Sequence, residues 1–135
     1  MIRGSCMCGG IKFEITGEPY SLSYCHCSRC RKSSGIFSAV LVGESDDLKI
    51  LQGEEFIKRI DPGPDWKIKR CFCTECGSPL GDMHNGKVYV VAASALDDEP
   101  AIAPSFHMHT NSKPHWYEIR DELKQFEGDY EPEAS

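Results

Sequence analysis

The chain has 135 residues, of which 40% are hydrophobic and 27% charged, which fits one globular domain rather than two. No stretch approaches the roughly 18 consecutive apolar residues of a membrane-spanning helix, and the N-terminal residues lack the apolar run of a secretory signal, so we expect a cytoplasmic protein with no membrane partner. The formal net charge of −6 disfavours nucleic-acid binding, and the basic run at residues 67–70 is interpreted as the solvated face of a strand.

Short segments in which apolar and polar residues alternate follow one another along the chain, separated by Gly, Pro, Asp and Asn. A period of two is typical of strands that bury one face and expose the other. The segments that this pattern predicts as strands are, in chain order, residues 11–16, 20–24, 36–42, 48–51, 56–60, 66–72, 87–93 and 105–110.

Turn chemistry and one helical segment complete the predicted elements. Residues 61–65 read Asp-Pro-Gly-Pro-Asp and predict a turn, and Asn85-Gly86 predicts the type I′ turn of a hairpin. Residues 119–126 predict a short helix. We therefore expect an all-β fold of packed antiparallel sheets, with a single domain over residues 1–127 and an acidic C-terminal tail over residues 128–135.

Seven of the eight cysteines lie in three close clusters, Cys6-Met-Cys8, Cys25-His-Cys27-Ser-Arg-Cys30 and Cys73-Thr-Glu-Cys76. Disulfide bonds and metal ligation are both open to so many thiols. Metal ligation is favoured, because no secretory signal is seen and cysteines two residues apart on an extended chain rarely meet disulfide geometry.

The two outer pairs supply four thiolates, the ligand set of a closed tetrahedral zinc site. Cys73-x-x-Cys76-Gly is typical of a zinc knuckle, in which the glycine permits a turn that points backbone N–H groups at the sulfurs. Cys6 and Cys8 are the natural partner pair, so we expect one structural zinc ion on these four residues.

The triplet Cys25, Cys27 and Cys30 supplies three thiolates and leaves one coordination position open. Zinc with three thiolates is formally −1, so it activates a carbonyl weakly but can still hold an incoming thiol as thiolate. The triplet therefore suits delivery of a sulfur nucleophile. The alternative is that a histidine or Cys71 completes a second structural site, although Cys71 is more simply read as a small, half-buried packed residue.

Arg29 and Arg31 flank the last cysteine of the triplet. Either guanidinium could bind a carboxylate of an anionic substrate beside the metal, and the alternative is that both are solvated. The histidines show no partner in the sequence. His26 lies between two ligands, so its side chain should point away from their metal, while His107 and His109 are spaced to face one pocket.

Three motifs stand in order along the chain. They are Gly4-Ser-Cys6-x-Cys8-Gly-Gly, Tyr24-Cys25-His26-Cys27-Ser28-x-Cys30-Arg31-Lys32-x-Ser34-Gly35 and Phe72-Cys73-x-x-Cys76-Gly77-x-x-Leu80. In these motifs the chain resembles the glutathione-dependent formaldehyde-activating enzymes, a family that includes the centromere protein V group. The resemblance extends from about residue 3 to residue 126.

The resemblance implies an all-β, Mss4-like zinc-binding fold with two zinc ions per chain. It implies structural zinc ligands at Cys6, Cys8, Cys73 and Cys76 and catalytic zinc ligands at Cys25, Cys27 and Cys30. The family's reaction adds glutathione to formaldehyde, giving S-hydroxymethylglutathione, and is classed as a carbon–sulfur lyase. The expected partners are therefore a small thiol such as glutathione and a small aldehyde.

Two other functions stay open on the residues alone. One is a non-catalytic, zinc-stabilised protein-binding module, for which fold analogy is the support. The other is a zinc or redox sensor that acts through Cys30 and Cys71. The fourth ligand at the triplet discriminates the enzyme from the binding module, because an open position favours catalysis and a protein side chain favours a structural site.

Overall fold

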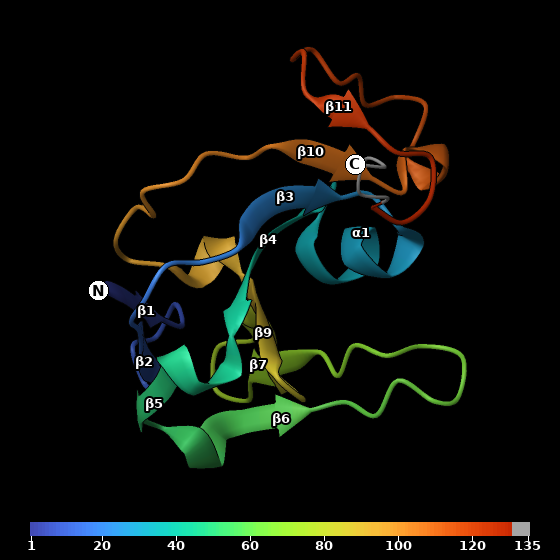
Figure 1. The fold of residues 1–135 in the computed structure, drawn as a ribbon. Helices are drawn as coiled ribbons and strands as arrows, with labels where there is room; N and C mark the ends of the chain where they lie inside the picture. The colour runs from blue at the N-terminus through green and yellow to red at the C-terminus, as the bar shows by residue number, and fades with distance from the viewer. Residues whose placement is uncertain (131–135) are drawn as a thin grey trace.

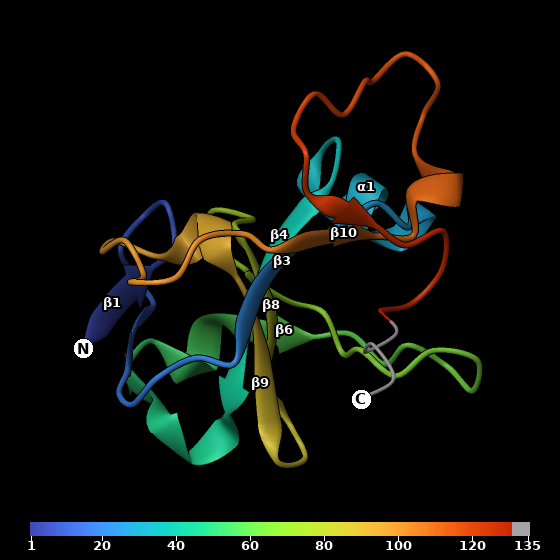
Figure 2. The ribbon, with the colours of Figure 1, turned by 45° about the horizontal axis from the view of Figure 1, so that its top comes forward.

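The computed structural model describes residues 1–130 and shows two β-sheets, with the short helix α1 (Ser28–Ser34) beside the larger one (Figure 1). The smaller sheet has three antiparallel strands in the order β1-β2-β5. Their bounds are β1 (Ile2–Ser5), β2 (Lys12–Ile15) and β5 (Leu48–Gln52). This sheet and α1 lie on opposite sides of the molecule in both ribbon views (Figures 1 and 2).

The larger sheet has eight strands among the described residues, in the order β11-β10-β3-β4-β9-β8-β7-β6. Their bounds are β3 (Ser21–Cys25), β4 (Ser38–Glu44), β6 (Ile57–Arg59), β7 (Cys71–Cys73), β8 (Pro79–Asn85), β9 (Val88–Ala92), β10 (Phe106–Met108) and β11 (Lys124–Gln125). Short 3-10 turns connect several of them, at Ser45–Asp47, Glu54–Phe56, Ala93–Ala95 and Thr110–Ser112.

The strand β10 makes the larger sheet mixed rather than purely antiparallel. It pairs in parallel with β3 on one side, where Met108 is in register with Cys25, and in parallel with β11 on the other. Parallel neighbours require a long crossover connection, and residues 26–105 separate β3 from β10. The late part of the chain is thereby placed beside the cysteine triplet.

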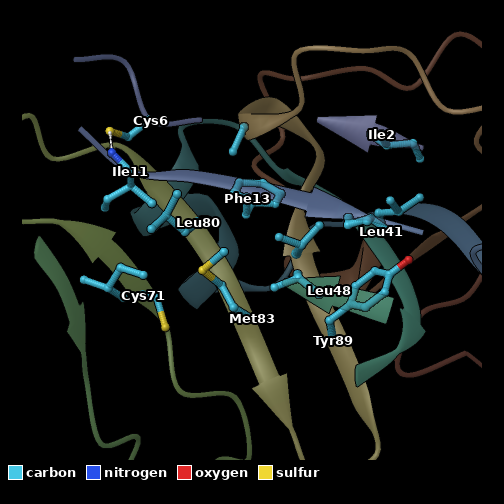
Figure 3. Close-up of a cluster of buried hydrophobic side chains, with 14 of the residues drawn as sticks. Ile2, Cys6, Ile11, Phe13, Leu41, Leu48, Cys71, Leu80, Met83 and Tyr89 are labelled. Atoms are coloured by element: carbon cyan, nitrogen blue, oxygen red, sulfur yellow. Dashed lines mark hydrogen bonds between the residues drawn. The ribbon is translucent and has the colours of Figure 1, made fainter. Parts of the chain in front are cut away.

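Side chains from both sheets form the main hydrophobic core (Figure 3). In β2, Phe13 and Ile15 are buried while Lys12 is exposed, as strand alternation requires. Tyr89 lies fully in this core, and its ring packs so closely over Gly43 that a Cβ there would come within 2.3 Å of the tyrosine oxygen. The core thus depends on a glycine in β4 as well as on its large side chains.

The predicted all-β fold is confirmed, and so are most of its strands. The segments predicted at residues 11–16, 20–24, 36–42, 48–51, 56–60, 87–93 and 105–110 overlap β2, β3, β4, β5, β6, β9 and β10 respectively, and β3, β4 and β5 extend one or two residues further. The hairpin turn predicted at Asn85-Gly86 joins β8 to β9. The strands β1 and β8 and the helix α1 were not predicted.

The helix predicted over residues 119–126 is wrong. That segment runs without regular structure to β11, and the carboxylate of Asp121 accepts hydrogen bonds from the backbone N–H of Leu123 and the ring of His107. Pairing of β11 with β10 then fixes the extended form. Tertiary hydrogen bonds therefore overrule the local helical pattern.

The strand predicted over residues 66–72 is present only at its end, where β7 begins at Cys71. Upstream, the backbone N–H of Lys69 donates to the carboxylate of Asp82 at 3.0 Å instead of entering a strand ladder. The segment between β6 and β7 therefore lies outside the sheets, and the ribbon shows it as a long loop (Figure 1).

Residues 131–135 of the predicted C-terminal tail lie outside the described residues. The preceding residues contact the domain, since the carbonyl of Gly128 accepts a hydrogen bond from the backbone of His109 and the ring of Tyr130 stacks on Phe106. Within residues 1–130, no helix has the length and apolar character needed to cross a membrane.

Candidate metal centres and the adjoining cleft

The four outer cysteines converge although more than sixty residues separate the two pairs. Cys6 and Cys8 follow β1, while Cys73 ends β7 and Cys76 lies in the turn before β8. The four Sγ atoms lie within 4.8 Å of one another, with Cys6 to Cys8 at 3.5 Å and Cys8 to Cys73 at 3.9 Å. Sulfurs at about 2.3 Å from a tetrahedral zinc ion are about 3.8 Å apart, so this group fits that ion.

Two glycine turns shape this group. Gly9 and Gly77 both have positive φ, and their backbone N–H groups donate to the carbonyls of Cys6 and Cys73 respectively. Further backbone N–H groups donate to the sulfurs, from Ile11 to Cys6 at 3.3 Å and from the turn after β7 to Cys73 at 3.4 Å. Such hydrogen bonds stabilise thiolates and orient them toward a shared cation.

The triplet assembles at the junction of β3 and α1. Cys25 ends β3, Cys27 is the N-cap of α1, and Cys30 lies in the first turn of the helix. Their Sγ atoms lie within 4.8 Å of one another, and Cys27 Sγ accepts the backbone N–H of Cys30 at 3.3 Å. Within residues 1–130, no fourth cysteine, histidine or carboxylate joins this group, so the donor set fits a metal ion with an open position.

The thiols of the triplet influence one another strongly. The side-chain hydrogen bond between Cys25 and Cys27 is the main cause: it raises the pKa of Cys25 and lowers the pKa of Cys27. Cys25 and Cys30 are also buried. Three thiols this close, two of them buried, cannot all ionise unless a cation compensates them, and a coordinated divalent metal ion does so.

Arg70 is a site residue that the sequence interpretation missed. Its Nη2 donates to Cys30 Sγ at 3.3 Å and its Nη1 donates to Ser33 Oγ at 3.2 Å. It belongs to the basic run that we interpreted as a solvated strand face, and for Arg70 that interpretation is wrong because its side chain reaches Cys30 and Ser33 in α1. A positive charge directly beside a thiolate stabilises it.

The two arginines that flank Cys30 point to different surroundings. The guanidinium of Arg29 lies 4.7 Å from the ring centroid of Trp66, a cation–π contact, and both residues line the cleft described below. Arg31 does not line it, and among the described residues its buried Nε has no hydrogen-bond partner. The structure therefore brings Arg29, rather than Arg31, to the cysteine triplet's open side.

A cleft of about 710 Å³ opens beside the triplet. All three of its cysteines line it, together with Arg29 and Arg70. Apolar side chains also line it: Val40, Ile60, Trp66, Ile68, Phe72, Pro79, Val90, Ala92 and Met108. The triplet is thus accessible to a small molecule, with the Arg70 guanidinium against the Cys30 sulfur and apolar side chains along the rest of the cleft.

The side chain of His26 takes part in a buried hydrogen-bond chain. Its Nε2 lies 2.7 Å from His107 Nδ1, and His107 Nε2 donates to the carboxylate of Asp121 at 2.9 Å. Burial lowers the pKa of His26 to about 4, so the ring is neutral, and its remaining nitrogen is buried without a partner among the described residues. The expectation that His107 and His109 face one pocket is wrong, because His109 lines the cleft while His107 is buried and hydrogen-bonded between His26 and Asp121.

Cys71 joins neither cysteine group. It is buried in the main core, more deeply than the half-buried position expected for it, and its Sγ donates to the carbonyl of Lys69 at 3.5 Å. Burial raises the pKa of its thiol. The interpretation of Cys71 as a small packed residue therefore agrees with its position.

Two sheets that carry a four-sulfur group and a three-sulfur group beside a cleft define a small all-β protein suited to holding metal ions. Residues 1–112 match the family described as glutathione-dependent formaldehyde-activating enzyme, and the chain belongs to this family. This agrees with the resemblance drawn from the motifs.

Two known proteins illustrate the similarity. A protein of Halomonas elongata, provisionally named a glutathione-dependent formaldehyde-activating enzyme, is 32% identical over 139 aligned residues, which cover 95% of this chain and 88% of that protein. A solved Rhodobacter sphaeroides structure superposes with a TM-score of 0.59 over 73% of this chain and 91% of that chain. At 24% identity, the second similarity shows the fold.

Proposed function

We propose that this protein is a zinc-dependent enzyme that adds glutathione, or a related small thiol, to formaldehyde or another small aldehyde. Such an activity belongs to the carbon–sulfur lyases. The observation that carries the proposal is the three-sulfur group, which lines an open cleft and has no fourth protein ligand within residues 1–130. The family's name supports the same substrates.

The two cysteine groups take different roles in this proposal. Cys6, Cys8, Cys73 and Cys76 hold a structural zinc ion, because four thiolates leave no position for substrate. Cys25, Cys27 and Cys30 hold a second, catalytic zinc ion. That ion supplies one open coordination position and keeps a bound thiol deprotonated near neutral pH.

The chain's own cations bind and orient the thiol. Arg70, held on Cys30 Sγ and Ser33 Oγ, offsets the negative charge that three thiolates concentrate at the bottom of the cleft. Arg29 binds a carboxylate of the thiol, and it is better placed than Arg31 because it lines the cleft. Its contact with Trp66 fixes the guanidinium before substrate arrives.

The bond changes are those of a simple addition. The thiol proton leaves to solvent, and the sulfur then attacks the carbonyl carbon of the aldehyde. A carbon–sulfur bond forms, the π bond of the carbonyl breaks, and its electrons go to the oxygen, which takes a proton from water. The product is the hydroxyalkyl thioether, and the reverse sequence releases thiol and aldehyde.

The test is NMR exchange spectroscopy on glutathione and formaldehyde with the zinc-loaded protein. We expect faster exchange between free formaldehyde and its glutathione adduct, abolished by Cys30→Ala and retained by Cys71→Ala, since Cys71 lies outside both groups. Exchange at the uncatalysed rate, at high protein concentration, would refute this substrate pair. It would favour the alternative of a zinc-stabilised protein-binding module.

The remaining features of the proposal follow from the thiols and the charge. We place the protein in the cytoplasm, because eight free cysteines persist as metal ligands or thiols in a reducing compartment. We propose no nucleic-acid partner, since the net charge is −6. The working unit is a single domain over residues 1–127, with residues 128–135 as its acidic tail.

A further inference from the structure

The cleft beside the triplet is much larger than formaldehyde needs. Its volume of about 710 Å³ lies in the range that holds ligands with many heavy atoms, roughly 300–1,000 Å³. Formaldehyde has one carbon and one oxygen, so it would contact only the sulfur end. Most of the cleft therefore serves another part of a substrate.

One apolar wall begins directly at the sulfurs. Val40, Val90 and Met108 pack against Cys25 and Cys30 in one hydrophobic cluster, and all of them line the cleft. They come from β4, β9 and β10, which the sheet order places near one another around β3. A reacting carbon at the triplet would therefore have hydrocarbon, not water, as its neighbour.

A second group of apolar residues comes from the loop between β6 and β7 and from the strands that follow. It consists of Ile60, Trp66, Ile68, Phe72 and Pro79. Ile60 is 45% exposed and Trp66 is 47% exposed. Large apolar side chains left exposed along a ligand cleft gain free energy when an apolar ligand covers them.

Glutathione does not account for this surface, because it is a polar peptide with charged carboxylates and a charged amine. The charged residues that line the cleft, Arg29, Asp65, Lys67, Arg70 and Asp129, are the ones that suit such a molecule. The apolar walls are left for the other reactant. That reactant is the carbonyl compound.

We propose that the carbonyl substrate of this protein is an aldehyde with a hydrophobic aliphatic or aromatic substituent, which lies along Val40, Val90 and Met108 while its carbonyl carbon lies at the cysteine triplet. This rests on the proposed function and names its substrate class. The reaction balances as before: the thiol sulfur bonds to the aldehyde carbon, the carbonyl oxygen gains a proton, and no oxidant or reductant takes part.

The first experiment varies the aldehyde at fixed glutathione, using the zinc-loaded full chain and formaldehyde, propanal, pentanal and benzaldehyde. After the spontaneous reaction is subtracted, kcat/KM should rise from formaldehyde to pentanal by about threefold to fourfold for each methylene that the cleft buries. Activity with formaldehyde and an equal or lower kcat/KM for pentanal and benzaldehyde would overturn this inference and leave the proposed function standing.

A matched pair of variants locates the effect. Val90 and Val42 are half-buried partners on adjacent strands, and Val90 lines the cleft while Val42 does not. Val90→Thr should lower the pentanal-to-formaldehyde ratio of kcat/KM severalfold, because it puts a hydroxyl in the wall without changing its shape. Val42→Thr should leave the ratio unchanged, and equal effects of the two variants would contradict the placement.

A binding measurement decides the question without turnover. S-methylglutathione, S-propylglutathione and S-pentylglutathione carry the same peptide and cannot react, so calorimetry on them reports the cleft alone. Affinity should rise severalfold along this series, and less so for Val90→Thr. An affinity that is flat in chain length would overturn the inference even if the protein proved inactive with every aldehyde.

Discussion

Arg70 connects the loop between β6 and β7 to the cysteine triplet through its bonds to Cys30 Sγ and Ser33 Oγ. Its contact with Cys30 spans 40 positions in the sequence, so no local pattern points to it. The cysteines differ in this respect. Their spacing alone predicted which residues group together, because cysteine is the residue that binds zinc as a thiolate and the geometry of short loops is restrictive.

Replacement of Arg70 tests its role on the triplet. Arg70→Gln removes a charged hydrogen bond, a kind worth about 1.5–3 kcal/mol, so we expect glutathione to bind the zinc-loaded protein tenfold to a hundredfold more weakly in titration calorimetry. Arg59→Gln is the control, since Arg59 is exposed and contacts Glu54 at 3.7 Å. Equal affinities in wild type and Arg70→Gln would remove Arg70 from the site.

The hydrogen-bond chain from His26 through His107 to Asp121 explains why no partner for these histidines was visible in the sequence. His26 and His107 are 81 positions apart and meet only because β10 pairs with β3. The expectation that His26 faces away from the metal agrees with its bond to His107. What could not be foreseen was that this side chain is fully buried and fixes the end of β3 to the late part of the chain.

His107→Phe keeps an aromatic ring and removes both hydrogen bonds. It leaves a buried donor of His26 without its partner, a loss of about 1–3 kcal/mol in the free energy of unfolding, which urea denaturation would measure. The control is His84→Phe, because His84 is exposed and, within residues 1–130, its ring hydrogen-bonds with the Ser45 hydroxyl alone. A similar small loss in both variants would show that the chain does not stabilise the fold.

At the scale of elements, the strands that bury one face were predictable and the short helix was not. The helix α1 contains Ser, Arg, Cys and Lys with no apolar periodicity, and only Cys30 is buried in it. It forms because Cys27 caps it and Arg31 and Lys32 lie favourably in its last turn. The segment at residues 66–70 was wrongly predicted as a strand for the opposite reason. Apolar and polar residues do alternate in it, but its apolar side chains line a cleft instead of the core of a sheet.

Alanine substitution at two glycines of similar φ distinguishes the cost of backbone strain from the cost of a steric clash. Gly81 in β8 has φ +76° and a Cβ there would lie 2.4 Å from the carbonyl oxygen of Val90, whereas Gly63 has φ +80° with open space around it. We expect Gly63→Ala to cost about 1 kcal/mol of stability, from backbone strain alone. Gly81→Ala should cost more than twice as much, because β8 and β9 must also separate.

Thermal unfolding of the two variants measures this difference. Equal shifts in the melting temperature would show that the β8–β9 pairing relaxes without cost.

At the scale of the whole molecule, the two cysteine groups should differ in how far the loss of their zinc ion destabilises the fold. Structural zinc binding contributes on the order of 10 kcal/mol, comparable to the entire stability of a domain, about 5–15 kcal/mol. Cys73→Ala should therefore leave the chain largely unfolded. Cys27→Ala should remain folded with one zinc ion per chain instead of two, because the main core includes Cys6 and Cys73 but none of the triplet.

Zinc content by mass spectrometry and circular dichroism of the two variants measure these outcomes. The contrary result is a Cys73→Ala protein that folds as well as wild type, or a Cys27→Ala protein that unfolds with it. Either would mean that the division into a structural and a catalytic group is wrong.

The proposed chemistry requires an open coordination position at Cys25, Cys27 and Cys30. X-ray absorption at the zinc edge, on protein loaded with two zinc ions, counts the sulfurs around them. We expect seven sulfurs and one lighter atom without added thiol, given the four-sulfur and three-sulfur groups, and eight sulfurs after glutathione is added. Eight sulfurs before any thiol is added, or a count that glutathione leaves unchanged, would contradict it.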